Sequence, residues 1–209
     1  NDKIGQKGKL FAIPNMLSYE DFFNENCLEK KNKTVLIVSR MHEVQKKISR
    51  ALKIWKEIEK DSGFNDWTLE IVGEGSSLCE YKLYASENLK RVKFFGKQEP
   101  KEFYQRASIF MMTSAYEGFG ITLTEAQQFG CVPIVLNTFS AAKDIITDGQ
   151  SGFLVDSDRM FVKRLKSLML DSEMRENMAR TAIKSSQKFS KENVTAQWIS
   201  LFNELCYNQ

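Results

Sequence analysis

Histidine is nearly absent from this 209-residue chain, and cysteine and proline are scarce. The single histidine, His42, rules out a multi-histidine metal site and leaves no credible Ser-His-Asp set. The four cysteines form no CxxC pair, so we expect reduced, mostly buried thiols of the kind found in cytosolic proteins. They are Cys27, Cys79, Cys131 and Cys206. No apolar run approaches the roughly 18 residues of a membrane-spanning helix, and no signal peptide opens the sequence.

A strong charge imbalance is also lacking. The formal net charge of +3 is too small to indicate nucleic-acid binding by itself. The hydrophobic fraction of 42% and the charged fraction of 27% are ordinary for a soluble globular protein. The length suits one domain with short extensions. The first residues, NDKIGQKG, include no Met, so we expect the chain to be a fragment of a longer protein.

Apolar runs alternate with helical patterns from Thr34 onward. Six runs predict strands: 34–39, 67–73, 91–96, 108–112, 131–136 and 152–155. The first is continuously apolar, as expected of a strand covered on both faces. Helical spacing predicts helices near 48–58, 78–87, 100–106, 121–129, 161–169, 172–188 and 194–205. Residues 11–16, FAIPNM, predict a further short strand that ends in a turn. This alternation predicts an α/β fold with a doubly wound parallel sheet, whose ligands bind at the carboxyl ends of the strands.

The loop YEGFGITLTEA, residues 116–126, concentrates polar groups between two apolar runs. Gly118 and Gly120 permit positive φ and a close backbone approach. The backbone amides from about Gly118 to Thr122 lie at a helix start, where the helix dipole favours an anion. Glu117 and Glu125 can accept hydrogen bonds from sugar hydroxyls. An alternative is a capping box at Thr122-x-x-Glu125 with Glu117 as a surface charge.

A second polar cluster, SRMHEVQKK, occupies residues 39–47. Arg40 comes directly after the first predicted strand, and Lys46 and Lys47 fall near the start of the next helix. Cations there oppose the helix dipole unless an anion is present, which favours a phosphate ligand. The alternative is a solvated loop.

Three other patterns are weaker signals. GEGSSL, residues 73–78, begins like a dinucleotide fingerprint but has Leu78 at the third glycine position. The acidic DSD at 156–158 is better explained as the N-cap region of a helix than as a metal site. No Walker A sequence is present.

The motifs YEGFGITLTEA, FGCVPIVL and DGQSGFLV, in this order, resemble glycosyltransferase family 4 over essentially the whole chain. The resemblance implies one Rossmann-like half of a GT-B fold and a retaining transfer of a hexosyl-type sugar from a UDP- or GDP-sugar. It divides the chain into an interdomain segment, 1–33, with IPN at 13–15; a donor-binding domain, 34–188; and a C-terminal helix, 189–209. It also implies a missing N-terminal domain that binds the acceptor, and no metal or other cofactor.

The resemblance carries roles onto individual residues. Glu117 matches the glutamate that contacts the transferred sugar, and Glu125 matches the one that holds the ribose. Arg40 and one lysine, Lys46 slightly favoured over Lys47, match the cations that neutralise the diphosphate. The catalytic set is therefore Glu117, Arg40 and Lys46. The expected donor-binding set is Glu125, Lys47, Gly118, Phe119, Gly120, Ile121, Thr122, Gly73 and Lys97, the last within the loop FGKQ, 95–98.

One departure and two rival functions accompany the resemblance. Many relatives have a glycine pair before the residue aligned with Asp144, whereas this chain has FSAAKD. A GT-B nucleotide-sugar 2-epimerase shares the fold and ligand class. A non-catalytic, receiver-like module would need an acidic residue at a central strand end, where this chain has Ser39, Gly73 and Gly96.

The family also suggests a setting for the reaction. What its members commonly do implies that this chain belongs to a cytoplasmic enzyme of surface-polysaccharide or glycolipid synthesis. The acceptor would be a sugar or a lipid-linked glycan. The missing domain would provide peripheral association with the inner face of the membrane. No nucleic-acid partner is expected.

Overall fold

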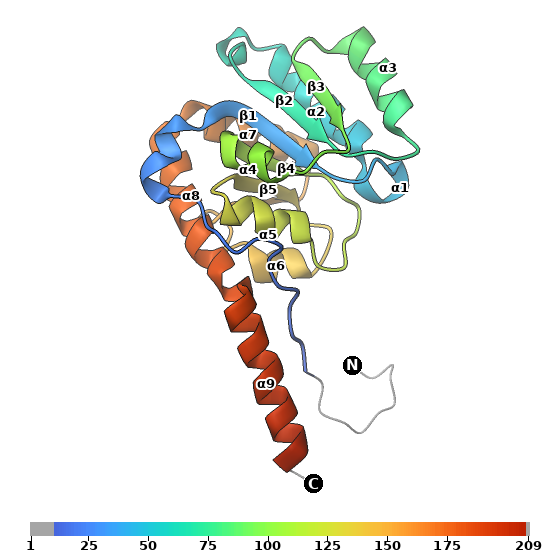
Figure 1. The fold of residues 1–209 in the computed structure, drawn as a ribbon. Coiled ribbons are helices and arrows are strands. Elements are labelled where there is room, and N and C mark those ends of the chain that lie inside the picture. Colours follow the sequence, from blue (N-terminus) through green and yellow to red (C-terminus); the bar gives the residue numbers. More distant parts are fainter. Residues whose placement is uncertain (1–10, 208–209) are drawn as a thin grey trace.

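The computed structural model describes residues 11–207 as a parallel six-stranded sheet with helices on both faces (Figure 1). The strands are β1 (Asn32–Val38), β2 (Thr68–Val72), β3 (Val92–Gly96), β4 (Ala107–Met112), β5 (Val132–Leu136) and β6 (Phe153–Val155). Their order is β3-β2-β1-β4-β5-β6, and every neighbouring pair is parallel. The predicted doubly wound α/β sheet is confirmed. The outermost parts of the predicted interdomain segment (1–10) and C-terminal helix (208–209) lie outside the described residues.

The long helices fall where the apolar spacing predicted them. Within residues 11–207 the α-helices are α1 (Glu43–Lys46), α2 (Ile48–Glu59), α3 (Leu78–Asn88), α4 (Lys101–Arg106), α5 (Ile121–Gln128), α6 (Ala141–Ile145), α7 (Asp158–Leu170), α8 (Ser172–Ser186) and α9 (Lys191–Tyr207). Short 3-10 helices are η1 (Glu25–Lys30), η2 (Ser62–Phe64) and η3 (Gln187–Phe189). The short α1 and α6 were not predicted. Ser157 caps α7 by accepting a hydrogen bond from the Met160 amide, which confirms the capping interpretation of DSD.

Alternate residues of each central strand enter two separate cores. In β1, Val35 and Ile37 pack with α2, α7 and α8, whereas Leu36 packs with α4, α5 and α6. Both faces of the strand are buried, which is why its sequence is apolar without alternation. The order reverses between β1 and β4, so the carboxyl ends of these two strands border the crevice where open α/β sheets bind ligands.

The prediction of a strand at residues 11–16 is wrong. Residues 11–16 have no regular structure, and this dark blue segment leads from the periphery toward the rest of the described chain (Figure 1). The chain that follows, residues 17–23, which we call the leading segment, lies against the helices instead of pairing with a sheet edge. Its Leu17 amide donates to the Phe189 carbonyl and its Phe23 amide donates to the Gln128 carbonyl.

The expectation of mostly buried thiols is also wrong. All four cysteines are unpaired, but Cys79 and Cys206 are exposed, Cys27 is half-buried and only Cys131 is buried. Cys79 lies in the first turn of α3, and Cys206 lies on α9, a helix that extends away from the sheet (Figure 1). No helix within residues 11–207 is long and apolar enough to span a membrane.

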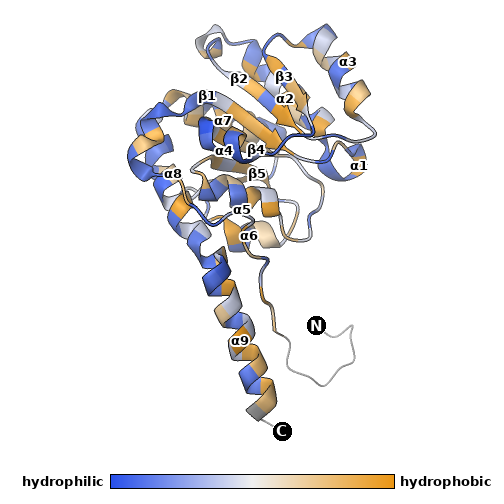
Figure 2. Ribbon diagram, in the orientation of Figure 1, coloured by the Kyte–Doolittle hydropathy of each residue, from blue (hydrophilic) through white to orange (hydrophobic). Residues whose placement is uncertain are grey.

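Helix α9 is largely uncovered by the rest of the described chain. Apolar residues recur along its exposed surface (Figure 2). The side chains of Trp198, Ile199, Phe202 and Leu205 are each 42–56% exposed, and the rings of Trp198 and Phe202 stack 5.8 Å apart.

Candidate functional site

The polar segments that follow β1 and β4 meet at the carboxyl edge of the sheet. Arg40, Lys46 and Glu117 come from these segments, although 71 positions separate Lys46 from Glu117. The Ala115 amide donates to the Gln45 carbonyl at 2.7 Å. The Thr113 hydroxyl donates to the carbonyls of Lys46 and Lys47. These bonds hold the two segments together at the crevice predicted from the strand order.

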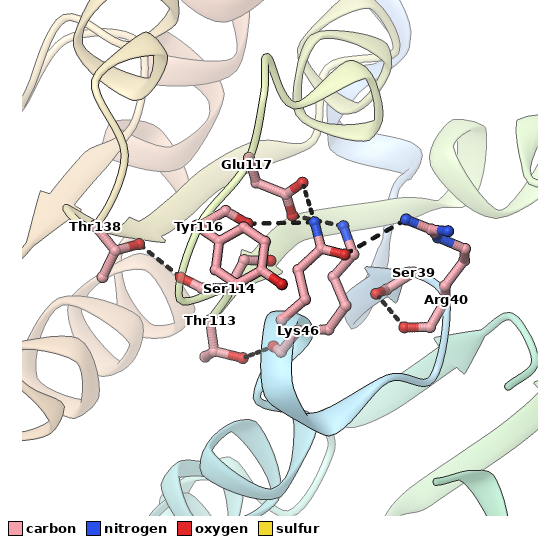
Figure 3. Close-up of polar contacts among 9 residues, drawn as sticks. Ser39, Arg40, Lys46, Thr113, Ser114, Tyr116, Glu117 and Thr138 are labelled. Carbon is pink, nitrogen blue, oxygen red and sulfur yellow. Dashed lines mark hydrogen bonds and ion pairs between the residues drawn. The ribbon is translucent and has the colours of Figure 1, made fainter. Parts of the chain in front are cut away.

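Lys46 and Glu117 form a nearly buried ion pair. Lys46 Nζ lies 2.6 Å from Glu117 Oε1, and the side chains are 13% and 8% exposed. Gln45 Nε2 donates to Glu117 Oε2 and to the Tyr116 carbonyl at 3.4 Å each. Figure 3 shows the Lys46 and Glu117 side chains meeting between the two segments, with Arg40 beside them. The alternative interpretation of this loop required Glu117 to be a free surface charge. The ion pair with Lys46 shows that it is not.

Arg40 is exposed and has no carboxylate partner among residues 11–207. Its guanidinium reaches only the Gln45 side-chain oxygen, at 3.4 Å. Such a cation, at the end of a central strand, is available to an anion that arrives from solvent.

The prediction that both lysines precede a helix is correct only in part. Lys46 is the last residue of α1, where the helix dipole favours a cation, so the dipole argument for a phosphate does not apply to it. Lys47 is the N-cap of α2 with φ 52°, the left-handed conformation. Lys46 lines the same hollow as Glu117, whereas Lys47 lies within the electrostatic reach of Glu43.

The start of α5 differs from the predicted capping box. Gly120 is the N-cap, with φ 98°, and no side chain caps this helix. Thr122 is the second helical residue, so the capping-box alternative is wrong. Gly118 does not adopt positive φ, so of the two glycines only Gly120 uses the freedom expected of both. The amides of Ile121 and Thr122 precede the first helical hydrogen bonds, which Leu123 and Thr124 donate to the Gly120 carbonyl.

Two adjoining hollows lie along this edge. The smaller has a volume of about 10 Å³ and includes Ser39, Lys46, Ser114, Glu117 and Thr122 in its wall. The larger is a groove of about 430 Å³, with walls from Arg40, Gly73, Glu74, Lys97, Gln98 and Thr122. Ser39, Val38 and Thr122 border both, so the two hollows adjoin each other at the ends of β1 and α5.

Gly73 is required by close packing between the loops that form the groove. A Cβ at Gly73, whose φ is 136°, would lie 1.8 Å from the Ser39 carbonyl oxygen. Backbone hydrogen bonds join Ser39 to Val72 and Gly73 to Gly96. The floor of the groove is therefore fixed before any ligand binds.

Other predicted donor-binding residues lie next to the hollows without lining them. Phe119 is half-buried and packs edge-on against Phe189, with ring centroids 5.4 Å apart. Ile121 is 43% exposed at the start of α5. The FSAAKD segment, residues 139–144, overlaps the start of α6, and its Asp144 is exposed. The Thr138 hydroxyl, just before that segment, donates to the Ser114 carbonyl at 2.6 Å (Figure 3).

Glu125 lies deeper than the other predicted site residues. It is 6% exposed in the second turn of α5 and lines neither hollow. Its Oε2 accepts a hydrogen bond from the Tyr104 hydroxyl at 2.9 Å. Burial raises the pKa of Glu125, while hydrogen bonds from Ser18 and Tyr104 oppose that rise.

The comparisons with known proteins agree with this geometry. The model of the glycosyl transferases group 1 family matches residues 18–185. The chain belongs to this family. Among residues 11–207 of this group 1 chain, no three His, Cys, Asp or Glu side chains gather where they could hold a metal ion.

A curated relative has a similar sequence over most of the chain. The amylovoran biosynthesis glycosyltransferase AmsD of Erwinia amylovora is 29% identical over 196 residues, which are 87% of this chain and 53% of that protein. The group 1 chain thus spans about half the length of this relative.

Two solved structures show the same fold. The pneumococcal O-GlcNAc transferase GtfA, solved in complex with UDP and GlcNAc, superposes with a TM-score of 0.83 at 19% identity. That match covers 97% of this chain and 41% of GtfA. The C-terminal domain of the group 1 protein LpcC from Francisella tularensis gives a TM-score of 0.67 at 22% identity, over 84% of this chain and 96% of that domain. These matches confirm the Rossmann-like fold found in GT-B glycosyltransferases.

Sequence patterns did not identify Glu43, a residue whose hydrogen bonds support the site. Glu43 of α1 accepts hydrogen bonds from the Ser49 amide and hydroxyl and from the Tyr81 hydroxyl, at 3.2, 2.6 and 2.8 Å. These bonds tie the turn that carries Lys46 to α2 and α3. Glu43 and Tyr81 are 38 positions apart, and no local pattern signals such a contact.

Proposed function

We propose that this group 1 chain is the donor-binding half of a retaining, family 4 glycosyltransferase with the GT-B fold. Its ligand is a nucleoside-diphosphate sugar, with UDP- and GDP-sugars as the candidates, and the transferred group is a hexosyl-type sugar. The observation that carries this proposal is the convergence of Arg40, Lys46, Glu117 and the start of α5 on two adjoining hollows. Two cations and a helix start suit a diphosphate, and the adjoining groove suits a base and ribose.

The names of related proteins support the same ligand class. AmsD is named for amylovoran biosynthesis, and GtfA was solved with UDP and GlcNAc. We extend these to a role in surface-polysaccharide or glycolipid synthesis, with a sugar or lipid-linked glycan as acceptor. We place the reaction in the cytoplasm, at the inner face of the membrane.

The cations of the site stabilise the leaving group in the proposed mechanism. A nucleoside diphosphate gains negative charge as its bond to the sugar breaks. Arg40, Lys46 and the first amides of α5 border the two hollows, so they can stabilise that charge where it develops. We expect no metal to be needed for this step.

The two glutamates serve different parts of the donor in this proposal. Glu117 borders the smaller hollow and contacts the transferred sugar, whose anomeric carbon becomes oxocarbenium-like. Glu125 holds the ribose hydroxyls from the second turn of α5. Gly73 and Lys97, in the groove wall, line the position of the base.

A second, acceptor-binding half completes the site in this proposal, because GT-B enzymes react in the cleft between two domains. The present chain by itself should bind nucleotide weakly and transfer no sugar. A longer protein that includes the second half should transfer it.

A thermal-shift panel with UDP, GDP, ADP and their sugars tests the proposal. A ligand at 100 times its Kd stabilises the fold by about 2.7 kcal/mol, or about 5–10 °C for a chain of this size. At the same ligand concentration Lys46→Met should reduce the shift by about half or more, whereas Lys163→Met, at an exposed lysine of α7 that lines neither hollow, should retain it. The proposal fails if no nucleotide raises Tm. Rapid epimerisation of the donor by the longer protein without acceptor would instead identify a 2-epimerase.

A further inference from the structure

The Glu125 carboxylate has a fixed hydrogen-bond donor inside the protein. Tyr104 of α4 is completely buried, and its hydroxyl donates to Glu125 Oε2 at 2.9 Å. The Tyr104 ring stacks on Phe129 with centroids 6.2 Å apart and an interplanar angle of 4°. Packing therefore fixes the position of the hydroxyl, which in turn restricts rotation of the carboxylate.

A second donor comes from the leading segment. The hydroxyl of Ser18, an exposed residue, hydrogen-bonds the same carboxylate. The segment is fastened to α5 three residues beyond Glu125, because Gln128 Nε2 donates to the carbonyls of Tyr19 and Asp21 at 2.9 and 2.8 Å. Ser18 therefore reaches Glu125 from a backbone that α5 itself holds in place.

The leading segment also contacts the loop after β3, which continues the wall of the groove. The Tyr19 hydroxyl donates to Glu99 Oε1 at 2.5 Å. Lys101 at the start of α4 pairs with Asp21 at 2.7 Å. Residues 17–23 thus bridge α4 and α5 at the position of Glu125.

We propose that Tyr104 and Ser18 are positioning residues that orient the Glu125 carboxylate toward the ribose hydroxyls of the donor, which makes the leading segment part of the donor site. The inference rests on the proposed function, in which Glu125 binds ribose. A carboxylate has about four lone-pair sites. Two are taken by the hydroxyls of Tyr104 and Ser18, and two remain for the two hydroxyls of a ribose. Held in this way, the carboxylate needs no reorientation when the nucleotide arrives.

Discrimination between ribose and deoxyribose tests the inference. Dissociation constants are measured by calorimetry for UDP and GDP, each paired with its 2′-deoxy counterpart. The wild-type chain should prefer the ribonucleotide about tenfold, the loss expected for one hydrogen bond to a charged group. Glu125→Ala should bring the ratio near one. Tyr104→Phe and Ser18→Ala should each lower the ratio, mainly by weakening the ribonucleotide.

A control variant at a second buried tyrosine separates the positioning role of Tyr104 from a general structural effect of losing a hydroxyl. Tyr81→Phe also removes a buried hydroxyl that donates to a carboxylate, at Glu43, so it should affect ribo- and deoxynucleotides alike and keep the ratio. Tyr104→Phe should also move the acid limb of ribonucleotide affinity to higher pH. The reason is that burial raises the pKa of Glu125 and the Ser18 and Tyr104 hydroxyls oppose that rise.

The outcomes distinguish this inference from the proposed function. If Glu125→Ala removes the ribose preference but Ser18→Ala and Tyr104→Phe keep the wild-type ratio, the positioning role is wrong and the donor-binding function stands. If Glu125→Ala leaves the ratio unchanged while nucleotides still bind, Glu125 does not bind ribose, and the inference is overturned although donor binding stands. If no nucleotide binds, both are overturned. Ser18 is exposed, so its variant answers the question even if Tyr104→Phe impairs folding.

Discussion

Lys46 and Glu117 neutralise each other, because their charged atoms lie 2.6 Å apart and their side chains are nearly buried. A diphosphate has to compete with Glu117 for the lysine. Glu117→Gln should therefore tighten UDP binding several-fold, since the lysine charge is released, whereas Lys46→Met should weaken it by about tenfold or more. In the longer protein Glu117→Gln should abolish transfer. Calorimetry and a transfer assay measure both effects, and equal losses of UDP affinity in the two variants would contradict the proposed partner exchange.

The protonation state of Glu125 should govern nucleotide affinity at mildly acidic pH. Burial raises the pKa of Glu125 above its ordinary value of 4.5. The carboxylate thus takes up its proton at a higher pH than an exposed glutamate does, and it then accepts fewer hydrogen bonds from ribose. UDP affinity should fall as pH drops toward this raised pKa, starting above 4.5. Calorimetry across pH checks this, with Glu125→Gln as the control that should show no such fall.

Residue types and their positions in the sequence predicted part of this site. The other site residues are brought in by contacts between positions far apart in the chain. Arg40 and Gly73 were identifiable because each follows an apolar strand, and strand ends share one edge of a parallel sheet. Tyr104 and Ser18 were not, because they meet Glu125 from positions 21 and 107 residues away in the chain. A tyrosine on a short helix or a serine before a strand has no local pattern that reveals such a partner.

At the level of elements, the turn that carries Lys46 depends on Glu43. Burial alone would raise the pKa of Glu43, but hydrogen bonds from Ser49 and Tyr81 hold it below its ordinary 4.5. A carboxyl with a lowered folded-state pKa contributes stability above its unfolded pKa, and this contribution is lost as pH falls through the folded value. Glu43→Gln should therefore lower Tm at neutral pH, with a difference from wild type that shrinks below about pH 4.5.

Thermal unfolding from about pH 7 to pH 3 measures this difference. Glu57→Gln is the control, because Glu57 forms an exposed i,i+3 pair with Lys60 that contributes little. Glu43→Gln should also weaken UDP binding, since α1 loses its ties to α2 and α3. A pH-independent loss of Tm would show that the charge of Glu43 is not what holds the turn.

Element length decided which parts of the fold were predictable. Strands β1, β2, β4 and β5 stood out because both of their faces are buried, which leaves runs of apolar residues. The helices α1 and α6, of four and five residues, are too short to show a period. The run at 11–16 is apolar, but a strand exists only with a hydrogen-bonded neighbour, and within residues 11–207 this segment pairs with no strand.

At the level of the whole molecule, α9 offers a test of the proposed second half. Its Trp198 is 42% exposed, whereas Trp55 and Trp67 are at most 2% exposed. Only Trp198 should therefore be strongly quenched by acrylamide in the present chain. If the second half packs on the apolar face of Trp198, Ile199, Phe202 and Leu205, the longer protein should lose this quenching and its emission should shift to shorter wavelength.

Trp198→Phe should remove the quenchable signal from the present chain, which assigns that signal to α9. Truncating Phe202 and Leu205 to Ala should restore quenching in the longer protein while leaving UDP affinity intact, because neither residue lines the hollows at the sheet edge. Equal quenching of the two unmodified proteins would mean that α9 stays exposed and that the second half is held by other surfaces.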